Sequence, residues 1–189
     1  MKYSKLTNKS NIFLKRFTHT SRHIHCSNIV TKLKYKTYLD FGTGDGQLFE
    51  FIKIKKKSKY YAYEPFKKMY RQFINNKKKL SHVKLIKKEE DLRKKYYDII
   101  SINEVIEHLP PKKIIKLFKI IKSITKKNSF IIISVPIEIG LSSLVKNLIR
   151  LLFNSKHEGL NLNNLIRSIF QKKIYRGKGN YYKSHIGFN

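Results

Sequence analysis

Residues 38–51 read YLDFGTGDGQLFEF, and the three glycines at alternate positions, directly after β-forming residues, restrict the local fold more than any other feature of the chain. Glycine lets the backbone turn tightly and lets a ligand approach main-chain N–H groups without a Cβ in between. We therefore predict that Gly42, Gly44 and Gly46 form the loop of a strand, loop and helix unit. The alternative is an ordinary glycine-rich turn with no ligand.

The chain from Lys36 onward alternates short β-rich runs with longer helical patterns, which indicates a parallel sheet covered by helices on both faces. The expected strands are 37–41, 59–64, 82–86, 97–103 and 129–135. The expected helices are 10–33, which could be a helical pair, 46–54, 65–80, 110–124, 140–153 and 162–170. Pro110 and Pro111 mark the start of the expected helix 110–124, which precedes the fifth strand. The predicted fold class is a doubly wound, mostly parallel α/β fold.

The net charge suggests an anionic partner, but its distribution does not. Lys and Arg number 42 against 12 Asp and Glu, a formal charge of +30, and such an excess is typical of nucleic-acid or membrane-surface partners. The lysines are nevertheless spread along nearly every segment, Arg is scarce, and Ala62 is the only alanine. We therefore favour the codon bias of an AT-rich genome over a nucleic-acid footprint.

The cysteine count and the apolar segments bear on compartment. Cys26 is the only cysteine, which excludes an internal disulfide framework and a Cys-rich zinc site and favours a reducing compartment. The N-terminus has no apolar stretch of signal-peptide length. Charged residues and a proline interrupt the longest apolar region, 130–153, so we expect no membrane span and a cytoplasmic protein.

Glu64 ends the second predicted strand, in KYYAYEP. A carboxylate at this place can accept hydrogen bonds from the two vicinal hydroxyls of a ribose, which indicates a nucleoside-containing cofactor. The alternative is a surface acid that merely ends a strand.

The glycine loop and three further segments resemble the sequence motifs of one protein family. DFGTGDG has GxGxG spacing with an acid two residues before the first glycine, unlike the dinucleotide fingerprint GxGxxG, and it resembles motif I of the class I (Rossmann-like) S-adenosylmethionine-dependent methyltransferases. NEVIEHL (103–109) is similar to the E-V-(L/I)-E-H signature of ubiquinone-biosynthesis O-methyltransferases, and 87–111 and 129–136 also look like family segments. The resemblance covers about 36–136, and THTSRH and SHIGFN extend it more loosely.

The resemblance implies S-adenosylmethionine as the cofactor and indicates which residues would bind its methionine end. Asp40 would lie beneath the loop and help to hold the methionine amino group, and Asn103 and Glu104 would lie near the methionine and sulfonium portion. The backbone lining the methionine moiety would come from Gly42, Thr43, Gly44 and Gly46.

The adenosine end is assigned in the same way. Glu64 matches the acid that binds the ribose, and Pro65 or Phe66 would flank the adenine. Asp91 resembles the acid that accepts from the adenine amino group, with Glu90 as a close competitor.

Glu107 and His108 are the candidates for a general base, or for binding a metal beside the acceptor. Equally, they could cap the helix that begins near Pro110 or organise the loop before it. A second group, His19, His23, His25 and Cys26, matches no zinc spacing, and a helix that lies over the cofactor is favoured instead. The prediction therefore includes no metal.

The acceptor is predicted to be a small molecule, methylated at oxygen. The D/N/S-P-P-Y/F/W loop of exocyclic base methylation is missing where the chain has NEVIEHL, and Cys26 lies before the sheet rather than after a proline as cytosine-C5 chemistry requires. The alternatives are an RNA or DNA methyltransferase, suggested by charge alone, a degenerate non-catalytic basic binding module and, more weakly, an NAD-dependent oxidoreductase.

We expect one domain over 1–189, with an N-terminal helical cap (1–35), a cofactor-binding core (36–136) and acceptor-side helices with a tail (137–189). The basic amphipathic helix 140–153 could contact an apolar or lipid-linked acceptor at a membrane surface, or simply pack on the domain. The family fold usually ends with a sixth and a seventh strand, and the chain ends at SHIGFN with little room for them, so we expect either a short sheet or a truncated product.

Overall fold

The computed structural model describes residues 13–76, 79–136, 140, 143–145, 147–148, 162–170, 172 and 174, and only the backbone for 13–19 and 162. The chain divides into two compact units. The first comprises Met1–Asn103 with Phe118–Ser134, and the second Glu104–Leu117 with Val135–Asn189.

A parallel sheet of five strands, in the order β3-β2-β1-β4-β5, forms the centre of the first unit. Its strands are β1 (Thr37–Phe41), β2 (Lys59–Tyr63), β3 (Val83–Ile86), β4 (Tyr97–Asn103) and β5 (Thr125–Ser134). This sheet confirms the predicted fold class, because it is the α/β arrangement of a Rossmann-like methyltransferase fold. β5 begins earlier than predicted, because Thr125 pairs with Tyr97, and Ser129 Oγ donates to the Tyr97 carbonyl over 2.7 Å.

The order of the strands reverses between β1 and β4. The chain runs outward from β1 to β2 and β3, and then crosses back to place β4 on the other side of β1. In open parallel sheets, ligands bind outside the carboxyl ends of the strands at such a switch point. The loops that follow β1, β2 and β4 are therefore the segments that matter for function.

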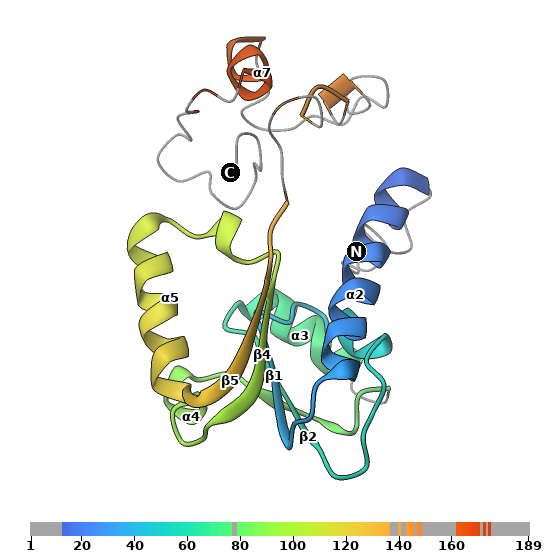
Figure 1. Cartoon of the computed structure of the whole chain (residues 1–189), viewed down its shortest axis with the longest axis vertical. Coiled ribbons are helices and arrows are strands. Elements are labelled where there is room, and N and C mark those ends of the chain that lie inside the picture. Colours follow the sequence, from blue (N-terminus) through green and yellow to red (C-terminus); the bar gives the residue numbers. More distant parts are fainter. Residues whose placement is uncertain are drawn as a thin grey trace. The chain divides into compact units, whose positions relative to one another are not determined.

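Helices lie on both sides of the sheet. In the first unit, α2 (Phe13–Lys32) and residues 118–124 of α5 (Pro111–Ile124) lie on opposite sides (Figure 1). The remaining helices of this unit are α3 (Lys67–Asn75) and the short α4 (Glu89–Leu92). The predicted helices 10–33 and 110–124 are confirmed, with residues 10–12 outside the described part and with α5 beginning at Pro111. The helix predicted over 65–80 forms but is shorter, because α3 ends at Asn75.

The helix predicted over 46–54 is wrong in extent. Only a single 3-10 turn, η1 (Gln47–Glu50), forms after the glycine loop. Side chains take the backbone groups that a longer helix would bond internally: Ser27 Oγ donates to the Phe51 carbonyl over 2.6 Å, and the Lys55 N–H donates to the Tyr60 hydroxyl over 2.7 Å. Because η1 has only four residues, it provides little of the dipole that a full helix over 46–54 would place beside the glycine loop.

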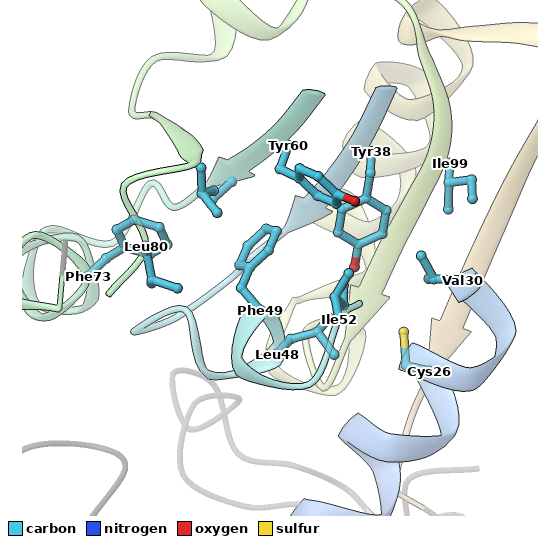
Figure 2. Packing of buried hydrophobic residues seen from close by; sticks show 12 residues of the cluster. Cys26, Val30, Tyr38, Leu48, Phe49, Ile52, Tyr60, Phe73, Leu80 and Ile99 are labelled. Atoms are coloured by element: carbon cyan, nitrogen blue, oxygen red, sulfur yellow. The ribbon is translucent and has the colours of Figure 1, made fainter. Parts of the chain in front are cut away.

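The core on the α2 side of the sheet is aromatic at its centre. Tyr38 pairs in register with Tyr60 on β2 and with Ile99 on β4, so the three side chains share one rung of the sheet. Figure 2 shows Cys26 and Val30 of α2 over this rung. Two residues further along β1, on the same side of the sheet, Asp40 lies between Ala62 and Ser101, which places polar groups directly beside the core, toward the carboxyl ends of the strands.

The second unit holds η2 (Ile106–His108), the first part of α5 and α7 (Leu162–Ile169), which confirms the helix predicted over 162–170. Residues 140, 143–145 and 147–148 are helical, and the rest of the predicted helix 140–153 lies outside the described residues, as does nearly all of the tail. Ser143 and Ser168, both buried, hydrogen bond through their hydroxyls over 2.6 Å. No helix of the described part is long and apolar enough to cross a membrane.

Candidate functional site

The loop after β1 owes its shape to its three glycines. Gly42, Gly44 and Gly46 have φ angles of 79°, 63° and 85°, in the left-handed region that residues with a Cβ rarely adopt. The N–H groups of Gly42 and Thr43 both donate to the Tyr63 carbonyl, over 2.8 and 3.1 Å. The loop is thus folded back against the end of β2.

Glu64 fastens the same loop through its side chain. Its Oε2 accepts from the Gly44 N–H over 2.8 Å, and its Oε1 accepts from the Phe66 N–H over 2.8 Å. The side chain is buried, and burial raises the pKa of Glu64 to about 7 against the two backbone hydrogen bonds, which lower it. The nearby Asp40 carboxylate raises it slightly further.

Asp40 is the second buried carboxylate, on β1 just before the loop. Its Oδ1 accepts from Ser101 Oγ over 2.7 Å, and Ser101 in turn hydrogen bonds to the Tyr38 hydroxyl over 2.6 Å. Burial raises the pKa of Asp40 to about 6; the hydrogen bond from Ser101 opposes the rise most, followed by the nearby Thr43 and Asn103 side chains.

Neither Asp40 nor Glu64 has a cationic partner among the described residues, although the chain carries 42 basic residues. Surface acids do have such partners: Glu89 pairs with Arg93, Asp91 with Lys94 and Asp98 with Lys126. Burying a carboxylate without a compensating charge is costly. Two such groups at the carboxyl ends of adjacent strands form a site suited to a cationic ligand.

Asn103, at the end of β4, completes this part of the site. Its Oδ1 accepts from Ser134 Oγ of β5 over 3.0 Å, and its Nδ2 donates to Cys26 Sγ of α2 over 3.7 Å. Both ends of the amide are therefore oriented by neighbours. Burial raises the pKa of Cys26 to about 12, and the Asp40 carboxylate adds to the rise, so Cys26 stays a neutral thiol.

The residues predicted to face an adenine differ in their surroundings. Pro65 is exposed and the Phe66 side chain is 61% exposed, directly after Glu64, so an aromatic ring is available to stack beside the loop. Asp91 and its competitor Glu90 lie on α4, and the Asp91 carboxylate accepts from Lys94 Nζ over 2.7 Å. Lys94 lowers the pKa of Asp91.

The predicted catalytic residues belong to the second unit. Glu107 is fully buried within η2 and His108 is partly buried at its end, where the His108 N–H donates to the Val105 carbonyl over 3.1 Å. Glu104, the first residue after β4, has a φ of 56°, a conformation that costs about 1–3 kcal/mol in a residue other than glycine. Such strain tends to occur at functional sites.

His23 and His25, the α2 histidines whose side chains the structure describes, have different surroundings. His23 stacks on Phe51 with ring centroids 5.6 Å apart, and burial followed by the charge of Arg22 lowers its pKa to about 4. His25 is exposed, and the His19 side chain lies outside the described part. Within the described residues, no three His, Cys, Asp or Glu side chains are grouped so as to hold a metal ion.

Sequence reasoning missed three residues that shape this site. Ser101 and Tyr38 support Asp40, and the buried Asp45 carboxylate accepts from Gln47 Nε2 over 3.2 Å within the loop. A usable signal for Ser101 was present in YDIISIN, where a serine and an asparagine alternate with isoleucines in a strand otherwise fit for burial. Tyr38 carries no such signal, because a tyrosine in a β-rich run is ordinary core.

A family model described as a methyltransferase domain matches residues 17–169. A comparison with curated proteins finds no match. Among solved structures, the chain is similar to the methyltransferase domain of bacterial CtHen1 (CtHen1-CN), at 18% sequence identity and a TM-score of 0.53, covering 62% of this chain and 66% of that one.

Two other solved structures are similar. The PH0226 protein from Pyrococcus horikoshii OT3 has 17% identity and a TM-score of 0.54, covering 82% of this chain and 67% of that one. Coclaurine N-methyltransferase bound to N-methylheliamine and S-adenosylhomocysteine has 14% identity and a TM-score of 0.50, covering 66% and 37%. At these identities the likeness concerns the fold, and the chain spans less than two thirds of the CtHen1 and coclaurine N-methyltransferase chains.

Proposed function

The chain belongs to the methyltransferase domain family and is an S-adenosylmethionine-dependent methyltransferase, and from this premise we propose that it methylates a small-molecule acceptor at oxygen. The observation that carries the site assignment is the pair of buried carboxylates, Asp40 and Glu64, held beside a glycine loop with no basic partner in the described part of the chain.

The residues present fit the cofactor. S-adenosylmethionine carries a positive amino group, which suits the buried Asp40 carboxylate, and two ribose hydroxyls, which suit the buried Glu64 carboxylate. A Cβ built on Gly44 would meet only one atom within 4 Å, Met69 Cε at 3.4 Å, so the loop leaves open space beside this residue. Both charge and shape therefore support binding of this cofactor.

At the methionine end, we propose that Asp40 accepts from the amino group, with the oriented amide of Asn103 and the strained Glu104 nearby. The backbone that lines this end comes from Gly42, Thr43, Gly44 and Gly46. At the adenosine end, Glu64 would accept from the ribose hydroxyls with the lone pairs that Gly44 and Phe66 leave unused.

The adenine would lie against Pro65 or the exposed ring of Phe66, with Asp91, or its neighbour Glu90, as the acceptor for the adenine amino group. Asp91 must exchange its contact with Lys94 for this role, and at 47% side-chain exposure that exchange costs little.

The cofactor, when bound, supplies an electrophilic methyl group on a positively charged leaving group. What the chain must contribute is alignment of the acceptor with that methyl group, and a base where the acceptor loses a proton. We propose Glu107 and His108 for proton removal. The competing role, organising η2 ahead of α5, predicts that Glu107→Gln and His108→Ala lower stability without lowering kcat.

Small-molecule acceptors are supported by the absence of base-methylation motifs and by NEVIEHL, which also supports oxygen. The structural relative with a bound ligand is named as an N-methyltransferase, so nitrogen is the competing acceptor atom. Two alternatives remain testable: an RNA or DNA methyltransferase, favoured by the charge of +30, and a basic binding module without turnover.

We also propose peripheral contact with a membrane surface through 140–153, in a protein of the cytoplasm. Leu144, Val145 and Leu148 are 37%, 55% and 55% exposed, whereas Ser143 and Asn147 on the same helical segment are fully buried. An outward apolar face on a basic chain suits an acceptor held at an anionic lipid surface.

The deciding experiment transfers a labelled methyl group from S-adenosylmethionine into fractionated cell extract. We expect label in the small-molecule or lipid fraction, as an ether or ester. Label in nucleic acid, with binding that falls steeply with salt, would replace the small-molecule proposal by the first alternative. Cofactor binding without labelling of any fraction would replace it by the second.

A further inference from the structure

A chain of three buried polar groups runs from the core to the proposed cofactor site. Tyr38 and Ser101 are 0% exposed and Asp40 is 3% exposed. The Tyr38 hydroxyl and Ser101 Oγ lie 2.6 Å apart, and Ser101 Oγ lies 2.7 Å from Asp40 Oδ1. Buried networks of this kind are retained only when every member is satisfied.

The direction of the two hydrogen bonds follows from the number of protons. An ionised Asp40 only accepts, so the single hydroxyl proton of Ser101 is donated to it. Ser101 Oγ must then accept from the Tyr38 hydroxyl. Both donors therefore point toward the carboxylate, and the bond from Tyr38 strengthens the one from Ser101.

We propose that Ser101, supported by Tyr38, is a positioning residue for the cofactor, because its hydroxyl holds the Asp40 carboxylate in the orientation and charge state that bind the methionine amino group. The proposal rests on the proposed function, in which Asp40 accepts from that group. It adds a residue of β4 that does not touch the cofactor, acting through the neighbouring strand β1.

Among the groups around Asp40, Ser101 does most to keep its carboxyl ionised. Cys26 of α2 stays a neutral thiol, and Glu64 at the end of β2 repels the Asp40 charge. Asn103 and Thr43 also lower the pKa of Asp40, but Ser101 is the largest opposing influence on a carboxyl that burial raises to about 6. Without Ser101, the pKa of Asp40 would rise further, so a larger fraction of the carboxyl would be protonated near neutral pH and its attraction for the amino group would weaken.

The test measures the pH dependence of S-adenosylhomocysteine binding by calorimetry in the wild type and in Ser101→Ala. For the variant we expect the pH at half-maximal affinity to rise by about one unit, with about twofold weaker binding near pH 7, about tenfold weaker binding near pH 5 and recovery at higher pH. Ser101→Thr retains a hydroxyl and should restore the wild-type profile. Tyr38→Phe should shift the profile in the same direction by less.

Ser27→Ala is the matched control. Ser27 is also buried in the first unit and donates to the Phe51 carbonyl over 2.6 Å, but it contacts no carboxylate. We expect this variant to lose stability and keep the wild-type pH profile. If Ser101→Ala does not fold, the shift in Tyr38→Phe decides the matter.

The proposal is overturned if Ser101→Ala, or Tyr38→Phe where the former does not fold, binds with an unshifted pH profile. A wild type that fails to bind S-adenosylhomocysteine at every pH would instead refute the cofactor site itself. The two failures are thus separable.

Discussion

The backbone N–H of Gly44 donates a 2.8 Å hydrogen bond to Oε2 of Glu64, so one carboxylate closes the glycine loop after β1 onto the end of β2. The same carboxylate accepts from the Phe66 N–H. Loop shape, the end of β2 and the start of the segment before α3 therefore depend on a single buried acid, which is also the group proposed to bind the ribose.

Glu64→Gln should separate these tasks. The amide keeps one oxygen for a backbone N–H but loses the charge and one acceptor, so S-adenosylhomocysteine should bind about 10- to 100-fold more weakly, as titration calorimetry would measure. Glu89→Gln is the matched control, because Glu89 pairs with Arg93 at the surface. Equal affinities of Glu64→Gln and wild type would remove Glu64 from the site.

Two alanine substitutions in the loop should have different consequences. At Gly46, φ is 85° and a Cβ would lie 2.6 Å from Leu80 Cδ1 and 2.7 Å from Phe73 Cε2, two buried side chains that cannot move away cheaply. Gly46→Ala should therefore cost about 2–5 kcal/mol in the free energy of unfolding, measured with urea.

Gly44→Ala meets only Met69 Cε at 3.4 Å, so its stability cost should stay near that of the left-handed backbone, about 1–2 kcal/mol. Its larger effect should be on S-adenosylhomocysteine affinity, because the added methyl group enters the space assigned to the ligand. Equal losses of stability in the two variants would contradict this distinction.

The sheet could be predicted from sequence because each strand is a run of β-forming residues, whereas the order of the strands, and with it the switch point, comes from the structure. The glycine loop and Glu64 could be recognised because their chemistry is local: turn geometry at Gly44 and an acid at a strand end. The roles of these residues depend on their neighbours in the sequence, so a local pattern is enough to predict them.

What sequence could not provide depends on distant partners. The helix expected over 46–54 was stopped by Ser27 and Tyr60, which take its backbone groups from elsewhere in the chain. β5 extends to Thr125 only because Tyr97 lies beside it. Ser101 acquires its importance from Asp40, 61 positions away, and no local pattern contains that contact.

Asp98 joins the start of β1 to β4 and should matter for stability alone. Its Oδ2 accepts from the N–H groups of Lys36 and Thr37 over 2.8 and 2.9 Å, and Oδ1 lies 3.2 Å from Lys126 Nζ. Asp98→Ala should lower the free energy of unfolding by about 2–3 kcal/mol with S-adenosylhomocysteine affinity unchanged. A loss of affinity in a folded variant would show that this end of the sheet also affects the site.

The raised pKa of Asp40 implies a definite pH dependence of stability. A carboxyl whose pKa rises from 3.8 to about 6 on folding contributes stability that is fully present below about pH 4 and is lost as pH rises through about 6. His23, with its pKa lowered to about 4, changes in the opposite sense, and Glu64, with its pKa raised to about 7, changes in the same sense as Asp40, so the profile of the whole protein mixes these effects.

The difference between Asp40→Asn and wild type isolates the carboxylate. Without cofactor, the variant should gain about 3 kcal/mol relative to wild type as pH rises from about 4 to 7, measured by urea unfolding across that range. With saturating S-adenosylhomocysteine the relative gain should shrink or reverse, because only the wild type offers a negative charge to the amino group. A pH-independent difference without cofactor would mean that Asp40 ionises at no cost, and the case for a site that requires a cationic ligand would fail with it.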